Sequence, residues 1–259
     1  MNIHIIGGGN LGVATAIGIT KYTSGHAVTI TRRNIENIQY LEKDGVTVSS
    51  SNTRNIDQAN LVILTIKPYQ VDLVLDEILP FLNNKTIIAS AVSGLSIDEL
   101  QKKCGSNLAI VHIMPNIAVR FGQSATCISF AEGDKIKAKQ VVDLFNNLGT
   151  VSVIDEKLMD AATVLGACGT AYALRYIRAS MQAGIEIGFD AATALSIASQ
   201  TAKGAATMAL EEKIHPEQLI DRVTTPQGCT IVGLNEMEHE GFSSSLIKGI
   251  KTSLKKITG

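Results

Sequence analysis

A glycine-rich turn near the start of the chain has the residue types and spacing that bind phosphate groups. A G-x-G-x-x-G pattern lies between the apolar run Ile3–Ile6 and a helical run at Val13–Ile19. In this setting the first glycine makes a tight turn, the second lets the backbone reach a pyrophosphate, and the third lets helix and strand pack closely. The first N–H groups and the positive dipole end of the helix then hold the phosphates. Glycine turns also occur for structural reasons alone, but this setting predicts a dinucleotide site. Its expected contacts are Gly7, Gly9, Asn10, Leu11 and Gly12.

The end of the second predicted strand bears on which dinucleotide binds. The run Ala27–Thr31 is followed by Arg32 and Arg33, and no acidic residue lies between the glycine turn and this point. NAD-specific sites place an acidic side chain here to bind the ribose 2′-hydroxyl, whereas a hydroxyl and two guanidinium groups suit the 2′-phosphate of NADP. The alternative is that both arginines are solvated loop residues. We expect NADPH as the cofactor, with NADH as the alternative, and contacts from Thr31, Arg32 and Arg33.

The stretch Val223–Thr230, which reads V-T-T-P-Q-G-C-T, is the second candidate site. Thr225 is of a type that caps helices, and Pro226 suits the first helical position, where a missing N–H costs nothing. A helix that begins there can bind a carboxylate with its free N–H groups. Those groups would belong to Gly228, Cys229 and Thr230, and Thr230 adds a hydroxyl. The alternative is a helix start without a ligand, which is common for a Thr-Pro pair.

No other grouping of reactive side chains stands out. The five histidines have no metal-ligand spacing, so we expect no metal site. His4 alternates within a core strand, which favours a structural role. The motifs G-x-S-x-G and H-E-x-x-H are absent.

Strands and helices alternate in the first part of the chain and must position these residues. The alternation predicts a doubly wound, mostly parallel, Rossmann-like α/β sheet over residues 1–155. Strand-like apolar runs lie at Leu61–Ile66, Thr86–Val92, Leu108–Ile113 and Ala125–Phe130, with a weaker edge candidate at Val151–Ile154. Helical segments lie at Tyr69–Leu82, Ser96–Cys104 and Lys135–Leu148, and the second begins with the capping box Ser96-x-x-Glu99.

Ligands of such sheets bind beyond the carboxyl ends of the strands. Three short segments follow predicted strands and are therefore candidates for ligand contacts. They are Lys67-Pro68, Ser93-Gly94 and Met114-Pro115-Asn116. In the alternative interpretation, the two prolines only end their strands.

From Glu156 onward the pattern changes from strands to helices. Leu158–Ile187 is rich in small residues, Ala191–Leu210 follows Asp190 as a predicted N-cap, and two shorter helices are expected to complete the chain. Residues 156–259 are therefore predicted to form an all-α substrate-binding and dimerisation domain. Its helices carry too many apolar residues to cover within one chain, which predicts a homodimer or a larger assembly of dimers. The alternative is a monomeric helical core.

Composition narrows the class of partner. The chain has 259 residues, 45% hydrophobic content and a net charge of -1, which is typical of a globular protein with one or two cores. No basic field is available for nucleic acid or an anionic membrane, so we expect a small-molecule partner. Four cysteines lie far apart, and the chain opens directly into a strand without a signal-like segment. These features predict a reducing, cytoplasmic location.

The order of the motifs resembles that of the pyrroline-5-carboxylate reductase family, whose members make L-proline from its cyclic imine with NAD(P)H. The resemblance covers nearly the whole chain. Its motifs are I-G-G-G-N-L-G at Ile6–Gly12, T-I-K-P at Thr65–Pro68, S-A-V-S-G-L-S at Ser90–Ser96, M-P-N at Met114–Asn116, D-A-A-T-V-L-G-A-C-G-T-A-Y at Asp160–Tyr172 and D-R-V-T-T-P-Q-G-C-T-I at Asp221–Ile231.

Two of these motifs depart from the family pattern. The family usually reads V-T-S-P-G-G-T-T in the last one, so Gln227 and Cys229 differ. In the long helix, the usual S-G-S-G-P-A-Y has lost both serines and the proline. It reads Gly166-Ala167-Cys168-Gly169-Thr170-Ala171-Tyr172. Because these departures cluster at the substrate end, they leave the identity of the imine open.

The resemblance implies roles for individual residues. Gly228, Cys229 and Thr230 would bind the substrate carboxylate by backbone N–H, and the Thr230 hydroxyl would bond the ring nitrogen. The flanking residues Val223 and Thr225 belong to the same loop. Asn52, Lys67 and Pro68 would line the cofactor. Asn116, which follows a predicted strand, is a further expected cofactor contact. The helical domains of two subunits would interlock, with the substrate loop facing the neighbouring nucleotide domain.

The absence of a lysine within Leu165–Ile187 separates this chain from the related β-hydroxyacid dehydrogenases, which carry a catalytic lysine in that helix. An iminium carbon already accepts hydride, so positioning can suffice without a strong acid. The main hypothesis is therefore NADPH-dependent reduction of 1-pyrroline-5-carboxylate. The alternatives are reduction of another cyclic imine or small keto acid, and a non-catalytic NADP-binding sensor or partner protein.

Overall fold

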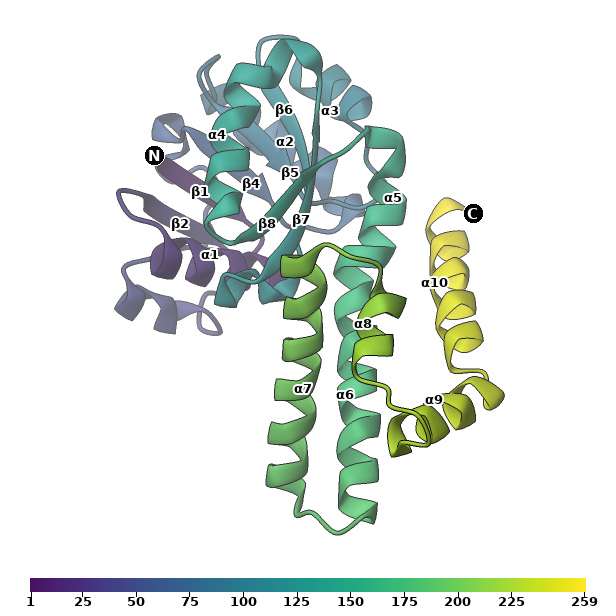
Figure 1. The fold of residues 1–259 in the computed structure, drawn as a ribbon. Helices are drawn as coiled ribbons and strands as arrows, with labels where there is room; N and C mark the ends of the chain where they lie inside the picture. Colours follow the sequence, from purple (N-terminus) through teal and green to yellow (C-terminus); the bar gives the residue numbers. More distant parts are fainter. The chain divides into compact units, whose positions relative to one another are not determined.

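The first part of the chain forms one eight-stranded sheet with helices on both faces (Figure 1). The computed structural model describes residues 1–259. The strands are β1 (Asn2–Ile6), β2 (Ala27–Thr31), β3 (Thr47–Ser49), β4 (Leu61–Leu64), β5 (Ile87–Ser90), β6 (Ala109–Met114), β7 (Ser124–Phe130) and β8 (Gly149–Val153). Their order is β3-β2-β1-β4-β5-β6-β7-β8, and only β6 and β7 pair antiparallel. The predicted doubly wound, mostly parallel sheet is confirmed.

Alternation along each strand divides the core into two layers. Ile3 and Ile5 of β1 and Ile63 of β4 pack on one face with α1 (Asn10–Tyr22) and α4 (Lys135–Asn146). Val62 and Leu64 of β4 pack on the other face with α2 (Val71–Ile78) and α3 (Ile97–Cys104). Because side chains alternate along a strand, continuous apolar runs are required where both faces are covered.

Several boundaries differ from those predicted. β3 was missed because it has only three residues, and β8 covers Gly149–Val153 at the edge of the sheet, where the weaker candidate was expected. The predicted helix at Tyr69–Leu82 is α2 flanked by the 3₁₀ turns η3 (Pro68–Gln70) and η4 (Leu79–Phe81). The remaining short turns are η1 (Gln39–Asp44), η2 (Ile56–Gln58), η5 (Ile117–Phe121), η6 (Glu132–Asp134) and η7 (Glu156–Leu158).

The long helix predicted at Leu158–Ile187 is not uniform. It begins as α5 (Met159–Ala162), passes through the π-helical segment η8 (Thr163–Cys168) and continues as α6 (Gly169–Glu186). The chain forms two compact units, residues 1–170 with 257–259, and residues 171–256. α5 and η8 pack on β7 and belong to the unit that contains the sheet. The predicted domain boundary at residue 156 stays a prediction.

The second unit consists of helices alone. After α7 (Ala191–Glu212) come α8 (Pro216–Arg222), α9 (Cys229–His239) and α10 (Phe242–Thr258), so the expectation of two further helices was wrong. The predicted N-cap of α7 is confirmed, because the Asp190 carboxylate accepts from the N–H groups of Ala192 and Thr193 at 3.0 Å. Tyr172 and Ser253 share a hydroxyl–hydroxyl hydrogen bond of 2.7 Å, which joins α6 to α10.

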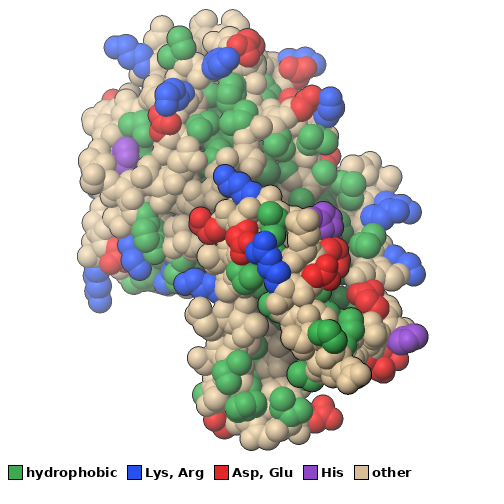
Figure 2. Space-filling view, viewed as in Figure 1, with side chains coloured by type: hydrophobic (Ala, Val, Ile, Leu, Met, Phe, Trp, Pro, Cys, Tyr) green, Lys and Arg blue, Asp and Glu red, His purple; other side chains and the backbone are tan.

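The surface mixes charges of both signs. On the face drawn in Figure 2, Lys and Arg side chains lie among Asp and Glu side chains. Exposed ion pairs such as Lys139–Asp143, at 2.7 Å, join neighbouring turns of helices. None of the helices combines the length and the apolar character that a membrane span requires.

Candidate active site

The glycine turn lies at the carboxyl end of β1, where the strand order changes direction between β2 and β4. This is the point at which doubly wound sheets bind ligands. Gly7 has φ +114°, and a Cβ there would lie 2.6 Å from the carbonyl oxygen of Thr65. A Cβ at Gly12 would lie 2.1 Å from the carbonyl oxygen of Gly7, whereas a Cβ at Gly9 would meet open space. The three glycines thus have the geometry that their spacing predicts, and the opening at Gly9 fits a pyrophosphate.

The neighbouring strands hold this turn in place. The Thr65 hydroxyl donates to the carbonyl oxygen of Gly7 at 2.8 Å, and the Gly8 N–H donates to that of Thr31 at 2.8 Å. α1 begins at Asn10, earlier than predicted, with Gly9 as an N-cap that offers no side-chain acceptor. The first N–H groups of a helix have no intrahelical partner. Those of Asn10, Leu11 and Gly12 are therefore available to an anion.

The end of β2 brings together two predicted cofactor residues. The Thr31 hydroxyl donates to Oδ1 of Asn52 at 2.6 Å, and Nδ2 of Asn52 donates to Oε2 of Glu77 at 2.8 Å. Nη1 of Arg32 donates to the carbonyl oxygen of Gly8 at 2.9 Å, which places this guanidinium against the glycine turn. The cofactor roles of Thr31 and Asn52 stay predictions, and the sequence could not show that these two residues bond to each other.

A pocket of about 220 Å³ opens beside the first turn of α1. It contains Arg32 but not Arg33, so the structure separates two arginines that the sequence had grouped. Its lining residues are Gly8, Gly9, Asn10, Val13, Ala14, Arg32, Asn37, Tyr40, Ile117 and Arg120. Sequence reasoning missed Asn37, Tyr40, Ile117 and Arg120, because no local pattern connects them to the glycine turn.

The segments that follow β4 and β6 differ in exposure. Lys67 and Pro68 are exposed, and the Lys67 N–H donates to Oε1 of Gln70 at 3.1 Å. Asn116 is 8% exposed. Its Oδ1 accepts from Ala118 N–H at 3.0 Å, and its Nδ2 donates to the carbonyl oxygen of Gly166 at 3.2 Å. Both side-chain atoms of Asn116 are thus engaged in structural bonds, and its contact with a cofactor stays a prediction.

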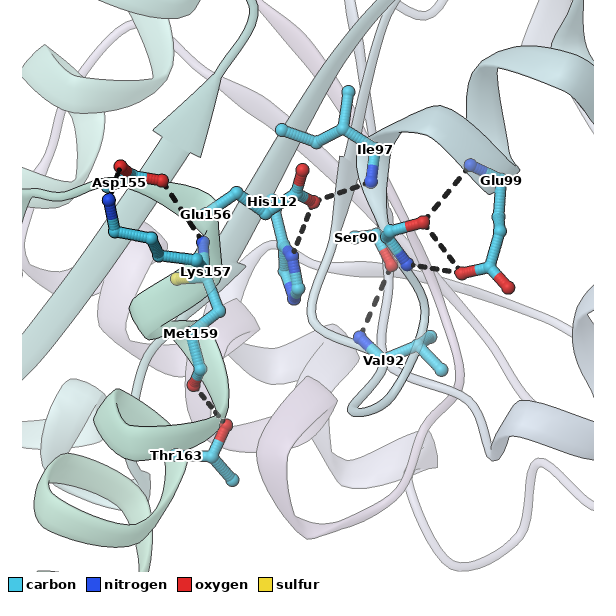
Figure 3. A network of polar contacts seen from close by, with 11 residues as sticks. Ser90, Val92, Ile97, Glu99, His112, Asp155, Glu156, Lys157, Met159 and Thr163 are labelled. Atoms are coloured by element: carbon cyan, nitrogen blue, oxygen red, sulfur yellow. Dashed lines mark hydrogen bonds and ion pairs between the residues drawn. The ribbon is translucent and has the colours of Figure 1, made fainter. Parts of the chain in front are cut away.

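A polar network joins the segment after β5 to β6 and to the segment after β8 (Figure 3). Oε1 of Glu156 accepts from the Ile97 N–H at 2.6 Å and lies 3.4 Å from Nδ1 of the buried His112. Burial lowers the pKa of His112, and the neighbouring Glu156 carboxylate opposes that shift. The predicted capping box at the start of α3 is confirmed, because Ser96 N–H donates to Oε2 of Glu99 at 2.8 Å and Glu99 N–H donates to Oγ of Ser96 at 3.2 Å.

The second candidate stretch folds differently from the prediction. Thr225 is not the N-cap of a helix, and Pro226 is not its first residue. Instead, Gly228 N–H donates to the carbonyl oxygen of Thr225 at 2.9 Å, which closes a turn with Gln227 at φ +58°. Proline fits the second position of such a turn and glycine usually fits the third, so Gln227 occupies a position that costs a non-glycine residue conformational energy.

α9 therefore begins three residues later than predicted, at Cys229, with Gly228 as its N-cap. The Gly228 N–H is used within the turn and cannot serve as a free donor, contrary to the prediction. The free N–H groups belong to Cys229, Thr230 and Ile231. No side chain caps them, and Cys229 and Thr230 are exposed, as is Val223 before the turn. This helix start can still hold a carboxylate, with the Thr230 hydroxyl in its first turn.

The residues of the long helix that differ from the family pattern lie in and just after the π-helical segment η8. Gly166, Ala167 and Cys168 form its second half. The Thr170 hydroxyl donates to the carbonyl oxygen of Gly166 at 3.4 Å. π-Helical segments inside α-helices often mark functional sites, but neither the composition nor the spacing of this stretch predicted one.

Two comparisons along the chain agree with these features. Residues 156–259 match the family model described as pyrroline-5-carboxylate reductase dimerisation, and residues 2–94 match the model described as NADP oxidoreductase, coenzyme F420-dependent. Pyrroline-5-carboxylate reductase 1 of Dictyostelium discoideum is 44% identical over 98% of this chain, which spans 49% of that longer relative. Pyrroline-5-carboxylate reductase 2 of the same organism is 40% identical over 98% of this chain and 91% of its own length. The chain belongs to the pyrroline-5-carboxylate reductase family.

Solved structures of this family have the same fold over almost all of the chain. The pyrroline-5-carboxylate reductase of Streptococcus pyogenes is 31% identical, with a TM-score of 0.84 over 99% of this chain and 98% of that one. The Plasmodium falciparum pyrroline carboxylate reductase, solved with NADP bound, is 26% identical, with a TM-score of 0.87 over 99% of this chain and 96% of that one. The Rossmann-like sheet and the helical region are thus the architecture of this oxidoreductase family.

Proposed function

We propose that this chain reduces 1-pyrroline-5-carboxylate to L-proline with NADPH, and that NADH is the alternative reductant. The observation that carries the proposal is the start of α9, where uncapped N–H groups and the Thr230 hydroxyl are exposed within the family's most specific motif. Family membership and the glycine turn at β1 support it. In this reaction the hydride adds to the carbon of the iminium, the protonated imine, whose ring nitrogen already carries the proton that it keeps in L-proline.

The residues of the sheet fit a dinucleotide. The opening at Gly9 and the first N–H groups of α1 would hold the pyrophosphate, and Arg32 would meet the phosphorylated ribose. Thr31 would orient Asn52 through their hydrogen bond, and Arg33, Lys67 and Pro68 complete the proposed contacts. A reduced nicotinamide, when bound, supplies the hydride.

The helical unit would supply the substrate site. The N–H groups of Cys229, Thr230 and Ile231, at the positive end of α9, would bind the carboxylate of the imine. The Thr230 hydroxyl would bond the ring nitrogen and hold the imine in the orientation that accepts hydride. Positioning of an activated carbon is worth several kcal/mol, so no lysine or histidine is needed as an acid.

The active assembly in this proposal is a homodimer located in the cytoplasm. The helical region matches a dimerisation model and has few buried apolar side chains of its own. The chain therefore forms a homo-oligomer, and a dimer is the smallest assembly that covers these helices. All four cysteines are free, which suits a reducing compartment.

Oxidation of NADPH by purified protein with 1-pyrroline-5-carboxylate tests the proposal, with proline identified as the product. A panel of other cyclic imines and small keto acids tests the substrate, because Gln227 and Cys229 depart from the family pattern. Intact NADPH binding without turnover of this imine would contradict the proposal.

Thr230→Ala tests the substrate role directly. The variant loses one hydrogen bond in the transition state, so we expect kcat/KM to fall by the equivalent of roughly 1–3 kcal/mol. NADPH affinity should stay within about twofold, since the cofactor residues belong to the other unit. Equal losses of NADPH affinity and turnover would show that the two functions are not separate.

A further inference from the structure

The pocket beside α1 has two arginines that come from distant parts of the sequence. Arg32 follows β2, and Arg120 lies in η5, between β6 and β7. Asn10 at the start of α1, with Asn37 and Tyr40 from the segment after β2, completes its polar lining. The structure thus adds a cation to this pocket that neither the glycine motif nor the end of β2 indicates.

Close backbone packing fixes the position of Arg120. A Cβ at Gly18 of α1 would lie 2.4 Å from the carbonyl oxygen of Val119, so η5 can approach α1 only because residue 18 is glycine. The Asn116 side chain caps the start of η5, and Gly122 ends it in the left-handed conformation with φ +66°. Arg120 is therefore carried by a short helix that is anchored to the phosphate-binding helix itself.

The charges in this pocket are not neutralised. Neither Arg32 nor Arg120 forms an ion pair with a carboxylate, and no acidic residue lines the pocket. Arg32 uses one guanidinium nitrogen on the carbonyl oxygen of Gly8 and keeps other N–H donors free. The Arg120 guanidinium lies 5.8 Å from the centroid of the Phe121 ring, a contact that leaves its charge without a carboxylate partner. Two guanidinium groups without an acidic partner, at the positive end of α1, favour a doubly charged anion such as a phosphate monoester.

We propose that Arg120, together with Arg32, binds the 2′-phosphate of NADPH and so selects this cofactor over NADH. The proposal rests on the proposed function only in taking NAD(P)H as the cofactor. It gives Arg120 the role that the sequence suggested for Arg33, which lies next to Arg32 but outside the pocket. Arg120 is then a specificity-determining residue for the reductant.

Calorimetric titration with adenosine 2′,5′-bisphosphate and with AMP measures the contribution of the 2′-phosphate without any reaction. We expect Arg120→Gln to weaken binding of the bisphosphate, and of NADP⁺, by about tenfold or more, because a charge-assisted contact to a phosphate is lost. AMP and NAD⁺ should change by less than about twofold. Arg120→Lys, which keeps the charge, should recover part of the loss.

Two further variants sharpen the comparison. Lys21→Gln removes an exposed cation at the other end of α1 and should leave the preference for the bisphosphate unchanged. Arg33→Gln should also have a smaller effect than Arg120→Gln. Since Arg120 is exposed, its replacement leaves the core intact, and the AMP titration verifies that the pocket is folded.

Three outcomes would overturn the proposal. Arg120→Gln could leave all affinities unchanged, it could weaken the bisphosphate and AMP equally, or Arg33→Gln could have the larger effect on the bisphosphate. Failure of the proposed function is a separate result, since it would appear as absent imine turnover while the effect of Arg120 on nucleotide affinity persisted.

Discussion

The buried histidines show how a single side chain can set the response of this fold to pH. His4 of β1 is 2% exposed, and its Nε2 atom has no hydrogen-bond partner. Burial lowers the pKa of His4 from 6.5 to about 4, because charging an imidazole inside the sheet is unfavourable. The structural role predicted for His4 is confirmed by this burial.

His4 should therefore destabilise the protein in mild acid. Above pH 6.5 the ring is neutral in both states; between pH 6.5 and about 4 the unfolded chain binds a proton that the folded chain excludes. The free energy of unfolding thus falls as the pH falls through this window, by about 2 kcal/mol between pH 7 and pH 5. In urea unfolding, His4→Val should lack this part of the pH dependence.

His239→Gln, at an exposed position on α9, is the matched control and should keep the pH dependence of the wild type. An identical change of unfolding free energy with pH in His4→Val and the wild type would show that folding does not lower the pKa of His4.

Residue roles could be predicted only where a local pattern carries them. The glycines of the phosphate turn and the alternation around His4 are local, and both agree with the structure. Arg120 could not be found in this way, since its place in the same pocket as Arg32 depends on the approach of η5 to α1. Hydrogen bonds such as Thr31–Asn52 likewise require the parallel pairing of β2 and β3.

Among the elements, helix starts were predicted with unequal success for a physical reason. Ser96 and Glu99 satisfy each other's backbone N–H groups, so their spacing specifies a helix start by itself. A Thr-Pro pair suits both a helix start and a β-turn. At Thr225 the chain forms the turn, and the helix begins only at Cys229. The sequence does not indicate the turn, because the turn places Gln227 at positive φ, where glutamine is uncommon.

The turn before α9 should be sensitive to any side chain at residue 228. A Cβ there would lie 2.4 Å from Oγ1 and 3.0 Å from the carbonyl oxygen of Thr225. Gly228→Ala must therefore open the turn and displace the start of α9. We expect KM for the imine to rise about tenfold or more, with NADPH affinity unchanged, since a shift of about 1 Å in a positioning element can cost a hundredfold in rate.

Gly233→Ala is the control within the same helix, because a Cβ at Gly233 would have no atom within 4 Å. It should retain the wild-type KM. Wild-type kinetics in Gly228→Ala would mean that the turn does not position the substrate.

At the scale of the whole molecule, the class of fold was predictable because alternation of strands and helices leaves few architectures. The boundary between the two parts was harder to locate. A continuous helical run gives no sign that its first turns pack on β7 while the rest belongs to the helical unit. Two further helices were expected after α7 without bounds, whereas the structure has three, α8, α9 and α10.

The apolar side chains of the helical unit explain why one chain cannot form a complete core there. From residue 171 onward, only Ala194, Ala198 and Leu219 are buried apolar residues. Leu174 of α6 is 58% exposed and Ile197 of α7 is 48% exposed, and these two helices run side by side (Figure 1). Burying each such side chain is worth roughly 1.5–3 kcal/mol, so a second copy of these helices would provide the missing core.

Sedimentation velocity at micromolar concentration should therefore show a dimer or a multiple of it. The double variant Leu174→Glu/Ile197→Glu introduces one charge on α6 and one on α7, at exposed apolar positions. It should sediment as a monomer and lose turnover. Ile136→Glu, at an isoleucine of α4 that is 87% exposed, is the control and should leave the assembly unchanged. A monomeric wild type would refute the dimer, whereas a dimeric double variant would show that subunits meet through another surface.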